Sequence, residues 1–144
     1  MDRASQSHNL LRVGVGLLLV AVLVGLAIPH FTTPRLALSA HLIGVLQGIL
    51  LLVLGLLWYR LSLTRMQFSL AFWLAVYQAV AAFLSNLLAA AWGAGNSIIP
   101  MAAGAAHGST AQEAIIVIGL RSAGAALIAA LLLVLWGLSR ASAA

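Results

Sequence analysis

The sequence predicts an all-α integral membrane protein, a four-helix bundle formed by residues 1–144 as a single domain. Hydrophobic residues make up 64% of the chain and charged residues only 6%, which is more apolar surface than a soluble domain of this size can bury. A membrane-spanning helix needs about 20 mainly apolar residues, so the chain has room for about four. The alternating segments typical of a β-barrel are absent, and we therefore expect helices to make the crossings.

The four expected spans cover residues 10–28, 39–58, 67–92 and 112–137. The polar residues 1–9 are expected to fray. The first span is interpreted as retained, because it ends on Pro29 and His30 and not on the small residues of a signal-peptide cleavage site. Pro29 and Pro34 bracket the first loop, since proline cannot continue a helix.

Local signals refine the helix ends. We expect Ser39 to be the N-cap of the second span, and Thr110 and Glu113 to form a capping box at the start of the fourth. The loop over residues 93–110 is rich in Gly and Ala and long for so small a protein. Long loops are often functional.

The distribution of arginine predicts the orientation. Five arginines lie at the two ends of the chain and in the second loop, namely Arg3, Arg12, Arg60, Arg65 and Arg140. The opposite side carries Arg35. The positive-inside rule therefore places both termini in the cytoplasm. The first and third loops then share the other side of the membrane, together with His30, His41 and His107.

Composition excludes several classes of function. Seven arginines without a lysine are too sparse for a nucleic-acid surface. The chain has no cysteine, which excludes disulfides, thiolate metal ligands and a cysteine nucleophile. Asp2 and Glu113 are the only carboxylate side chains, so carboxylate-driven hydrolysis and proton-coupled transport are not expected. The sequence contains no P-loop, G-x-S-x-G or H-E-x-x-H motif.

His41 is the first candidate for chemistry. On a helix, His41, Gly44 and Gly48 share one face, and Gln47 lies about a third of a turn away. One interpretation is a small-residue packing face with a buried histidine. The other is that His41 ligates a metal or haem iron, since one imidazole suffices for five-coordinate haem. Gln47 would then orient a ligand, or it would bond to another helix.

Arg121 lies inside the fourth span, where a charge costs at least ~2.5 kcal/mol and often marks function. It would extend toward the interface, pair with Glu113, or bind a carboxylate such as a haem propionate. On the third span, Tyr77, Gln78 and Asn86 make either interhelical hydrogen bonds or a pocket for a small aromatic substrate.

Three segments carry a family resemblance: the run from Thr33 to Gly44, the run from Leu87 to Gly93, and the loop that holds Gly104-Ala105-Ala106-His107 before Gln112-Glu113. They resemble hydroxylaminobenzene mutase, a small bacterial membrane enzyme. The resemblance implies an isomerase that moves the hydroxyl group of an arylhydroxylamine from nitrogen to the adjacent ring carbon, giving a 2-aminophenol. It also implies a bacterial inner membrane.

The chain is more distantly similar to styrene oxide isomerase, a four-span enzyme that uses haem b as a Lewis acid and forms trimers with haem between protomers. That resemblance implies His41 as the axial ligand and Gln47, where that family has Asn, as the amide near the open iron position. Its catalytic tyrosine aligns near Ala82, so Tyr77 is a displaced substitute.

We therefore predict Gln47, Tyr77 and Asn86 as catalytic residues. The predicted haem contacts are His41, Gly44, Gly48, Arg35 and Arg121. The expected assembly is a homotrimer. Two alternatives stay open: a haem-dependent isomerase of epoxides to aldehydes, and a non-enzymatic transport or structural subunit of the membrane.

Overall fold

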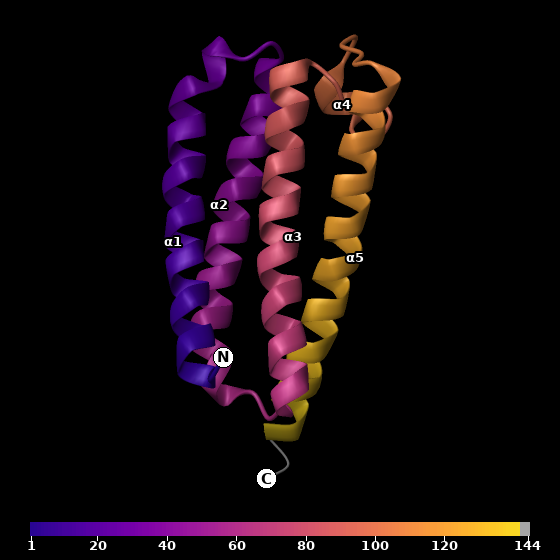
Figure 1. The fold of residues 1–144 in the computed structure, drawn as a ribbon. Coiled ribbons are helices and arrows are strands. Elements are labelled where there is room, and N and C mark those ends of the chain that lie inside the picture. Colours follow the sequence, from indigo (N-terminus) through magenta and orange to yellow (C-terminus); the bar gives the residue numbers. More distant parts are fainter. Residues whose placement is uncertain (142–144) are drawn as a thin grey trace.

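The computed structural model describes residues 1–141, and these residues form helices joined by short loops (Figure 1). In chain order the elements are α1 (Arg3–Ala27), η1 (Ile28–His30), α2 (Pro34–Leu57), η2 (Trp58–Arg60), α3 (Arg65–Trp92), α4 (Pro100–Ala103) and α5 (Thr110–Ala141). The helices α1, α2, α3 and α5 are long and apolar enough to cross a membrane. The predicted all-α class is confirmed, and so are four helices long and apolar enough to cross a membrane; these helices begin earlier than the predicted residues 10, 39, 67 and 112.

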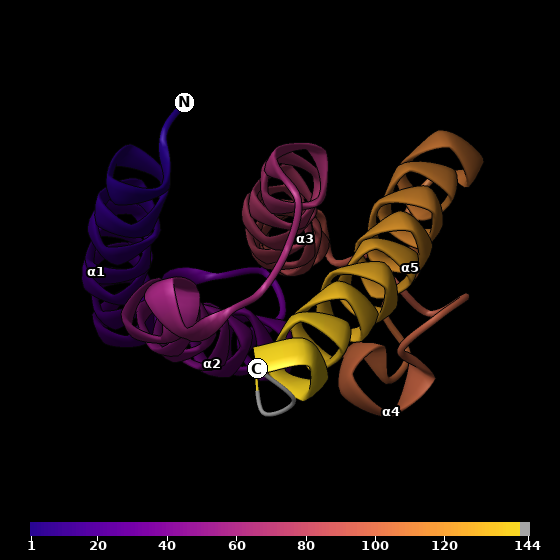
Figure 2. The same ribbon diagram turned by 90° about the horizontal axis from the view of Figure 1, so that it is seen from below.

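The four long helices form an open arrangement. Each packs mainly on the next one in the chain: α1 on α2, α2 on α3, and α3 on α5. Within residues 1–141, α5 makes no close backbone approach to α1 or α2, and Figure 2 shows α1 and α5 at opposite edges. The start of α1 and the end of α5 lie at the same end of the molecule, as expected, and α4 lies at the other end (Figure 1).

Small residues bring α1 and α2 close together. A Cβ atom on Gly14 would lie 2.9 Å from the carbonyl oxygen of Gly48, and a Cβ on Gly48 would lie 2.9 Å from the carbonyl oxygen of Gly14. Nothing larger than hydrogen fits at either position, so the two backbones meet there directly. This contact fixes how α2 presents His41 to α1.

The expected fraying of residues 1–9 is wrong. Asp2 caps α1 by accepting a hydrogen bond from the Ser5 backbone at 2.8 Å, and the helix begins at Arg3. Ser7 lies one turn later and donates to the carbonyl oxygen of Gly55 on α2 at 2.8 Å. The polar start of α1 is thus held by tertiary hydrogen bonds, which a local polarity pattern does not reveal.

Two expected caps are displaced. Thr33 precedes α2 and Pro34 occupies its first turn, where a missing N–H costs nothing, so Ser39 lies inside the helix. At the start of α5, the reciprocal bonds join Ser109 and Gln112 at 2.8 and 3.3 Å. That capping box lies one residue before the expected one, because Glu113 binds the preceding loop instead.

Candidate functional site around His41

The orientation of the His41 ring is set by α1. Its Nδ1 lies 2.7 Å from the carbonyl oxygen of Ala21. A carbonyl only accepts hydrogen bonds, so Nδ1 must carry the proton. In the neutral imidazole the other ring nitrogen, Nε2, then keeps its lone pair, and no residue among 1–141 donates to it. The ring is half-buried. A neutral imidazole oriented by a backbone carbonyl through Nδ1 is the usual form of a metal-ligating histidine.

Gly25 makes room for this ring. A Cβ atom at Gly25 would lie 2.6 Å from His41 Nδ1 and 2.8 Å from His41 Cε1. Any side chain there would displace the imidazole from Ala21. The sequence analysis missed both Gly25 and Ala21, because no local pattern links them to a histidine on the next helix.

Gly44 and Gly48 lie where α2 meets its neighbours. A Cβ at Gly44 would lie 2.7 Å from the Cβ of Ala21 and 2.7 Å from Cδ2 of Phe83 on α3. Gly48 faces α1, as described above. Both glycines therefore serve the close packing of helices, which was one of the two interpretations of this face. Their contact with a cofactor stays a prediction.

Gln47 is held by α3. Its Oε1 accepts a hydrogen bond of 2.9 Å from Nε2 of Gln78, which also donates to the carbonyl oxygen of Ala75 at 3.2 Å. Since that carbonyl only accepts, the Gln78 amide has one orientation, and Gln47 must present its oxygen to it. The NH₂ group of Gln47 then points away from Gln78 and has no acceptor among residues 1–141.

Gln78 leaves one polar atom without a partner. The side chain is 1% exposed, and its Oε1 accepts no hydrogen bond. A buried acceptor left unpaired costs about 1–3 kcal/mol. Together, Gln47 and Gln78 place one free donor and one free acceptor between α2 and α3, deep in the spans.

Asn86 and Tyr77 lie at two different interfaces. Asn86 is buried between α2 and α3, where it accepts from Ser39 at 3.1 Å and donates to the carbonyl oxygen of Ala82 at 2.9 Å. The Tyr77 hydroxyl lies 2.7 Å from Oγ of Ser122 on α5, on an exposed surface. The fold does not bring Tyr77 to His41, since Tyr77 bonds to α5 and His41 to α1.

The predicted cationic residues Arg35 and Arg121 are exposed. Arg121 does not pair with Glu113, whose carboxylate accepts from the backbone N–H groups of the loop before α5. The four donors are Gly95 at 2.8 Å, Asn96 at 3.3 Å, Ser97 at 3.1 Å and Gly108 at 3.2 Å. Neither arginine has an acceptor among residues 1–141, so both are free to meet an anion from outside the chain. His30 and His107 are also exposed.

The residues present fit a haem group with one protein ligand. Among residues 1–141, no three His, Asp or Glu side chains gather to hold a metal ion by themselves. A haem iron is already held by its porphyrin, and one imidazole completes a five-coordinate centre. The Nε2 lone pair of a neutral His41 would supply that donor, and the exposed arginines suit carboxylates.

Comparison with known proteins identifies the family. The family model described as styrene oxide isomerase matches residues 6–139. Hydroxylaminobenzene mutase HabB of Ectopseudomonas oleovorans is 43% identical over 140 residues, which are 97% of this chain and 85% of that protein. Hydroxylaminobenzene mutase HabA of the same organism is 36% identical over 127 residues, 88% of this chain and 94% of that protein. No solved structure matches significantly.

These matches confirm the resemblance that the sequence motifs predicted, and they favour an enzyme over a structural or transport subunit. The chain belongs to the styrene oxide isomerase family and is a membrane isomerase of the mutase type.

Proposed function

We propose that the protein converts arylhydroxylamines to 2-aminophenols in the bacterial inner membrane. The observation that carries this proposal is the 43% identity to a hydroxylaminobenzene mutase along 97% of the chain. In the reaction the N–O bond breaks and a C–O bond forms at the adjacent ring carbon. The proton lost from that carbon balances the one gained at nitrogen, so no external oxidant or reductant is needed.

Haem b is the proposed cofactor, with His41 Nε2 as its axial ligand. When bound, it supplies a Lewis acid for the N–OH group of the substrate. Ala21 holds the imidazole in the required tautomer through the bond of 2.7 Å. Arg35 and Arg121 are proposed to pair with the propionates, and a homotrimer would bring copies of these exposed residues together.

Gln47 is the proposed hydrogen-bond donor to the substrate. Its NH₂ group is turned away from Gln78 and has no acceptor in the described chain. Such a donor, fixed in an apolar site, stabilises negative charge that develops on the departing oxygen. In the proposed site, apolar side chains would exclude water, so that the hydroxyl group returns to the same ring. Asn86 and Tyr77 are the further proposed catalytic residues.

The test is absorption spectroscopy and turnover on purified full-length protein. Wild type is expected to show a Soret band and to convert phenylhydroxylamine to 2-aminophenol. His41→Ala is expected to lose both, and added imidazole is expected to restore the band. His8→Ala is the matched control, since His8 is exposed at the far end of α1. A colourless, metal-free and fully active wild type contradicts the haem assignment, and no turnover contradicts the mutase assignment.

A second candidate is an epoxide isomerase that forms an aldehyde. The family model favours it, since its description names styrene oxide. The same preparation assayed with styrene oxide decides between the two. Turnover of the epoxide that exceeds turnover of phenylhydroxylamine would replace the first proposal.

A further inference from the structure

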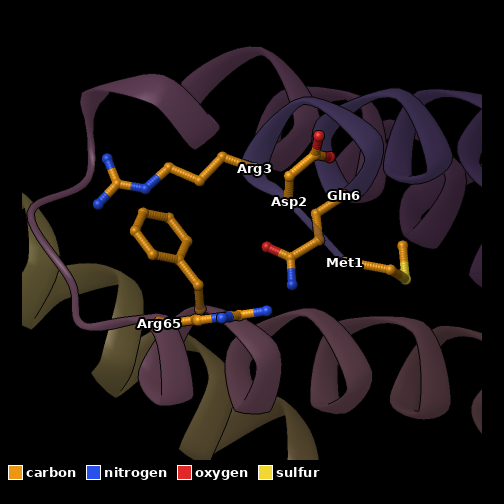
Figure 3. A pocket seen from close by; sticks show the side chains of 6 residues that line it. Met1, Asp2, Arg3, Gln6 and Arg65 are labelled. Carbon is orange, nitrogen blue, oxygen red and sulfur yellow. The ribbon is translucent and has the colours of Figure 1, made fainter.

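A pocket of about 370 Å³ lies where the start of α1 faces the start of α3 (Figure 3). This is the end of the molecule opposite α4 (Figure 1). It is lined by Met1, Asp2, Arg3, Gln6, Arg65 and Phe68. The polar groups of this pocket are mainly hydrogen-bond donors, and none of them takes part in the proposed reaction. Trp58, Tyr59 and Arg60 lie at the same end of the molecule, a combination typical of the membrane–water interface.

Gln6 presents its amide NH₂ group to this pocket. The side chain is only 3% exposed. Its Oε1 accepts a hydrogen bond of 3.2 Å from the indole Nε1 of Trp58. Because an indole only donates, this bond fixes the amide with its oxygen toward Trp58. The NH₂ group has no acceptor among residues 1–141, and Figure 3 shows it pointing toward the guanidinium group of Arg65.

Two guanidinium groups flank this amide. Arg3 is held in place, since it donates to the carbonyl oxygen of Leu63 at 3.3 Å and lies 4.2 Å above the ring centre of Phe68. Arg65 is exposed and has no acceptor in the described chain. Asp2 uses its Oδ1 to cap α1, and Figure 3 shows its carboxylate pointing away from Arg65. Donors therefore face one another across the pocket without an acceptor between them.

We propose that this pocket binds the phosphate group of an anionic phospholipid. A phosphate accepts hydrogen bonds through several oxygens, and arginine matches its geometry with two parallel bonds. The acyl chains would follow the apolar surface of α1 and α3 into the bilayer. The arginine distribution places this end of the molecule in the cytoplasmic leaflet, where anionic lipids gather.

The experiment measures binding to the full-length protein in detergent micelles. Thermal unfolding is followed while dihexanoyl phosphatidylglycerol, dihexanoyl phosphatidylcholine or inorganic phosphate is added, because a ligand of the folded state raises the midpoint. The variants are Arg65→Gln, which removes a charge from an exposed side chain, and Gln6→Glu, which keeps an acceptor for Trp58 but replaces the NH₂ group with an oxygen. Arg60→Gln is the matched control, since Arg60 is exposed at the same end and does not line the pocket.

Phosphatidylglycerol is expected to raise the midpoint more than phosphatidylcholine does. The dissociation constant of phosphatidylglycerol is expected to rise about tenfold in Arg65→Gln and in Gln6→Glu, because each variant loses a hydrogen bond to the charged phosphate and such a bond contributes about a factor of ten or more to affinity. The constant is expected to stay unchanged in Arg60→Gln. Equal weakening in Arg60→Gln would show general attraction to positive charge and overturn the proposal, as would unchanged binding in Arg65→Gln. An equal effect of inorganic phosphate would make the free ion the occupant and overturn the assignment to lipid.

Discussion

His41 Nδ1 lies 2.7 Å from the carbonyl oxygen of Ala21, and this single bond ties the proposed haem ligand on α2 to the backbone of α1. The acceptor is a backbone carbonyl and not a side chain. Substitution of the Ala21 side chain therefore leaves the acceptor in place, and the position of the His41 ring depends on how closely α1 and α2 approach. The following predictions test that dependence and the other contacts of the site.

Gly25→Ala is expected to displace the His41 ring, since the new Cβ would lie 2.6 Å from Nδ1. Haem affinity should fall about 10–100-fold, as it does when the group that orients a metal ligand is lost. Gly16→Ala is the control, because a Cβ at Gly16 meets nothing within 4 Å. Haem titration of both variants checks this. Equal affinity in the two variants would contradict a role for Gly25.

Gln78→Leu is expected to release Gln47 and lower kcat about tenfold, as the loss of one positioned hydrogen bond does, with little change in stability. A hydrogen bond between membrane helices averages about 0.6 kcal/mol, and the variant also removes the unpaired Oε1 of Gln78. Steady-state kinetics and thermal unfolding measure the two effects.

Gln47→Leu and the double variant complete the cycle for this pair. If Gln78 acts through Gln47, the double variant should be no slower than Gln47→Leu. Additive losses would mean that the two amides act independently. Unchanged kcat in all three variants would leave the pair a purely structural contact.

Tyr77→Phe and Ser122→Ala each remove the same hydrogen bond of 2.7 Å between α3 and α5. The first also removes the phenol, whereas the second leaves it in place. A catalytic Tyr77 predicts a loss of kcat of about 100-fold or more in Tyr77→Phe alone. Matching kinetics in the two variants would reduce Tyr77 to a helix contact.

Glu113→Gln is expected to loosen the loop before α5. The carboxylate accepts from four backbone N–H groups, and an amide offers only one oxygen in place of two. Hydrogen bonds to a charged acceptor are worth about 1.5–3 kcal/mol each. Hydrogen exchange of residues 95–108 should accelerate by about tenfold or more, whereas exchange in the middle of α3 should not change. Unaltered exchange in the loop would contradict this role.

The sequence predicted the class of fold well, because membrane spans depend on composition and length alone. The prolines placed the first turn within a few residues, since α1 ends at Ala27 and α2 begins at Pro34. What could not be predicted were contacts that depend on the relative rotation of two helices. For Gln47 the sequence left open a ligand or a bond to another helix, and no local signal indicated that Gln78 supplies that bond. Likewise, nothing local connects Gly25 with His41.

The start of α1 also shows that contacts with residues distant in the sequence escape a local pattern. Residues Gln6 and Ser7 look like a polar tail, yet they are buried because Trp58 and the Gly55 carbonyl meet them. Likewise, Thr110 and Glu113 have the spacing of a capping box, but Glu113 is engaged by loop amides that come from up to 18 residues away. The two capping motifs were thus correct in kind and displaced in position, by Pro34 at α2 and by the loop contacts of Glu113 at α5, whereas the fraying expected of residues 1–9 was wrong.

The open arrangement of the helices also gives the chain a simple order of assembly. Each long helix finds its main neighbour in the helix made just before it: α2 on α1, α3 on α2, and α5 on α3. During synthesis, a span that enters the bilayer therefore meets its partner already in place. Each long helix can therefore pack before the later helices are made. Contacts between segments that are close in sequence also favour fast folding.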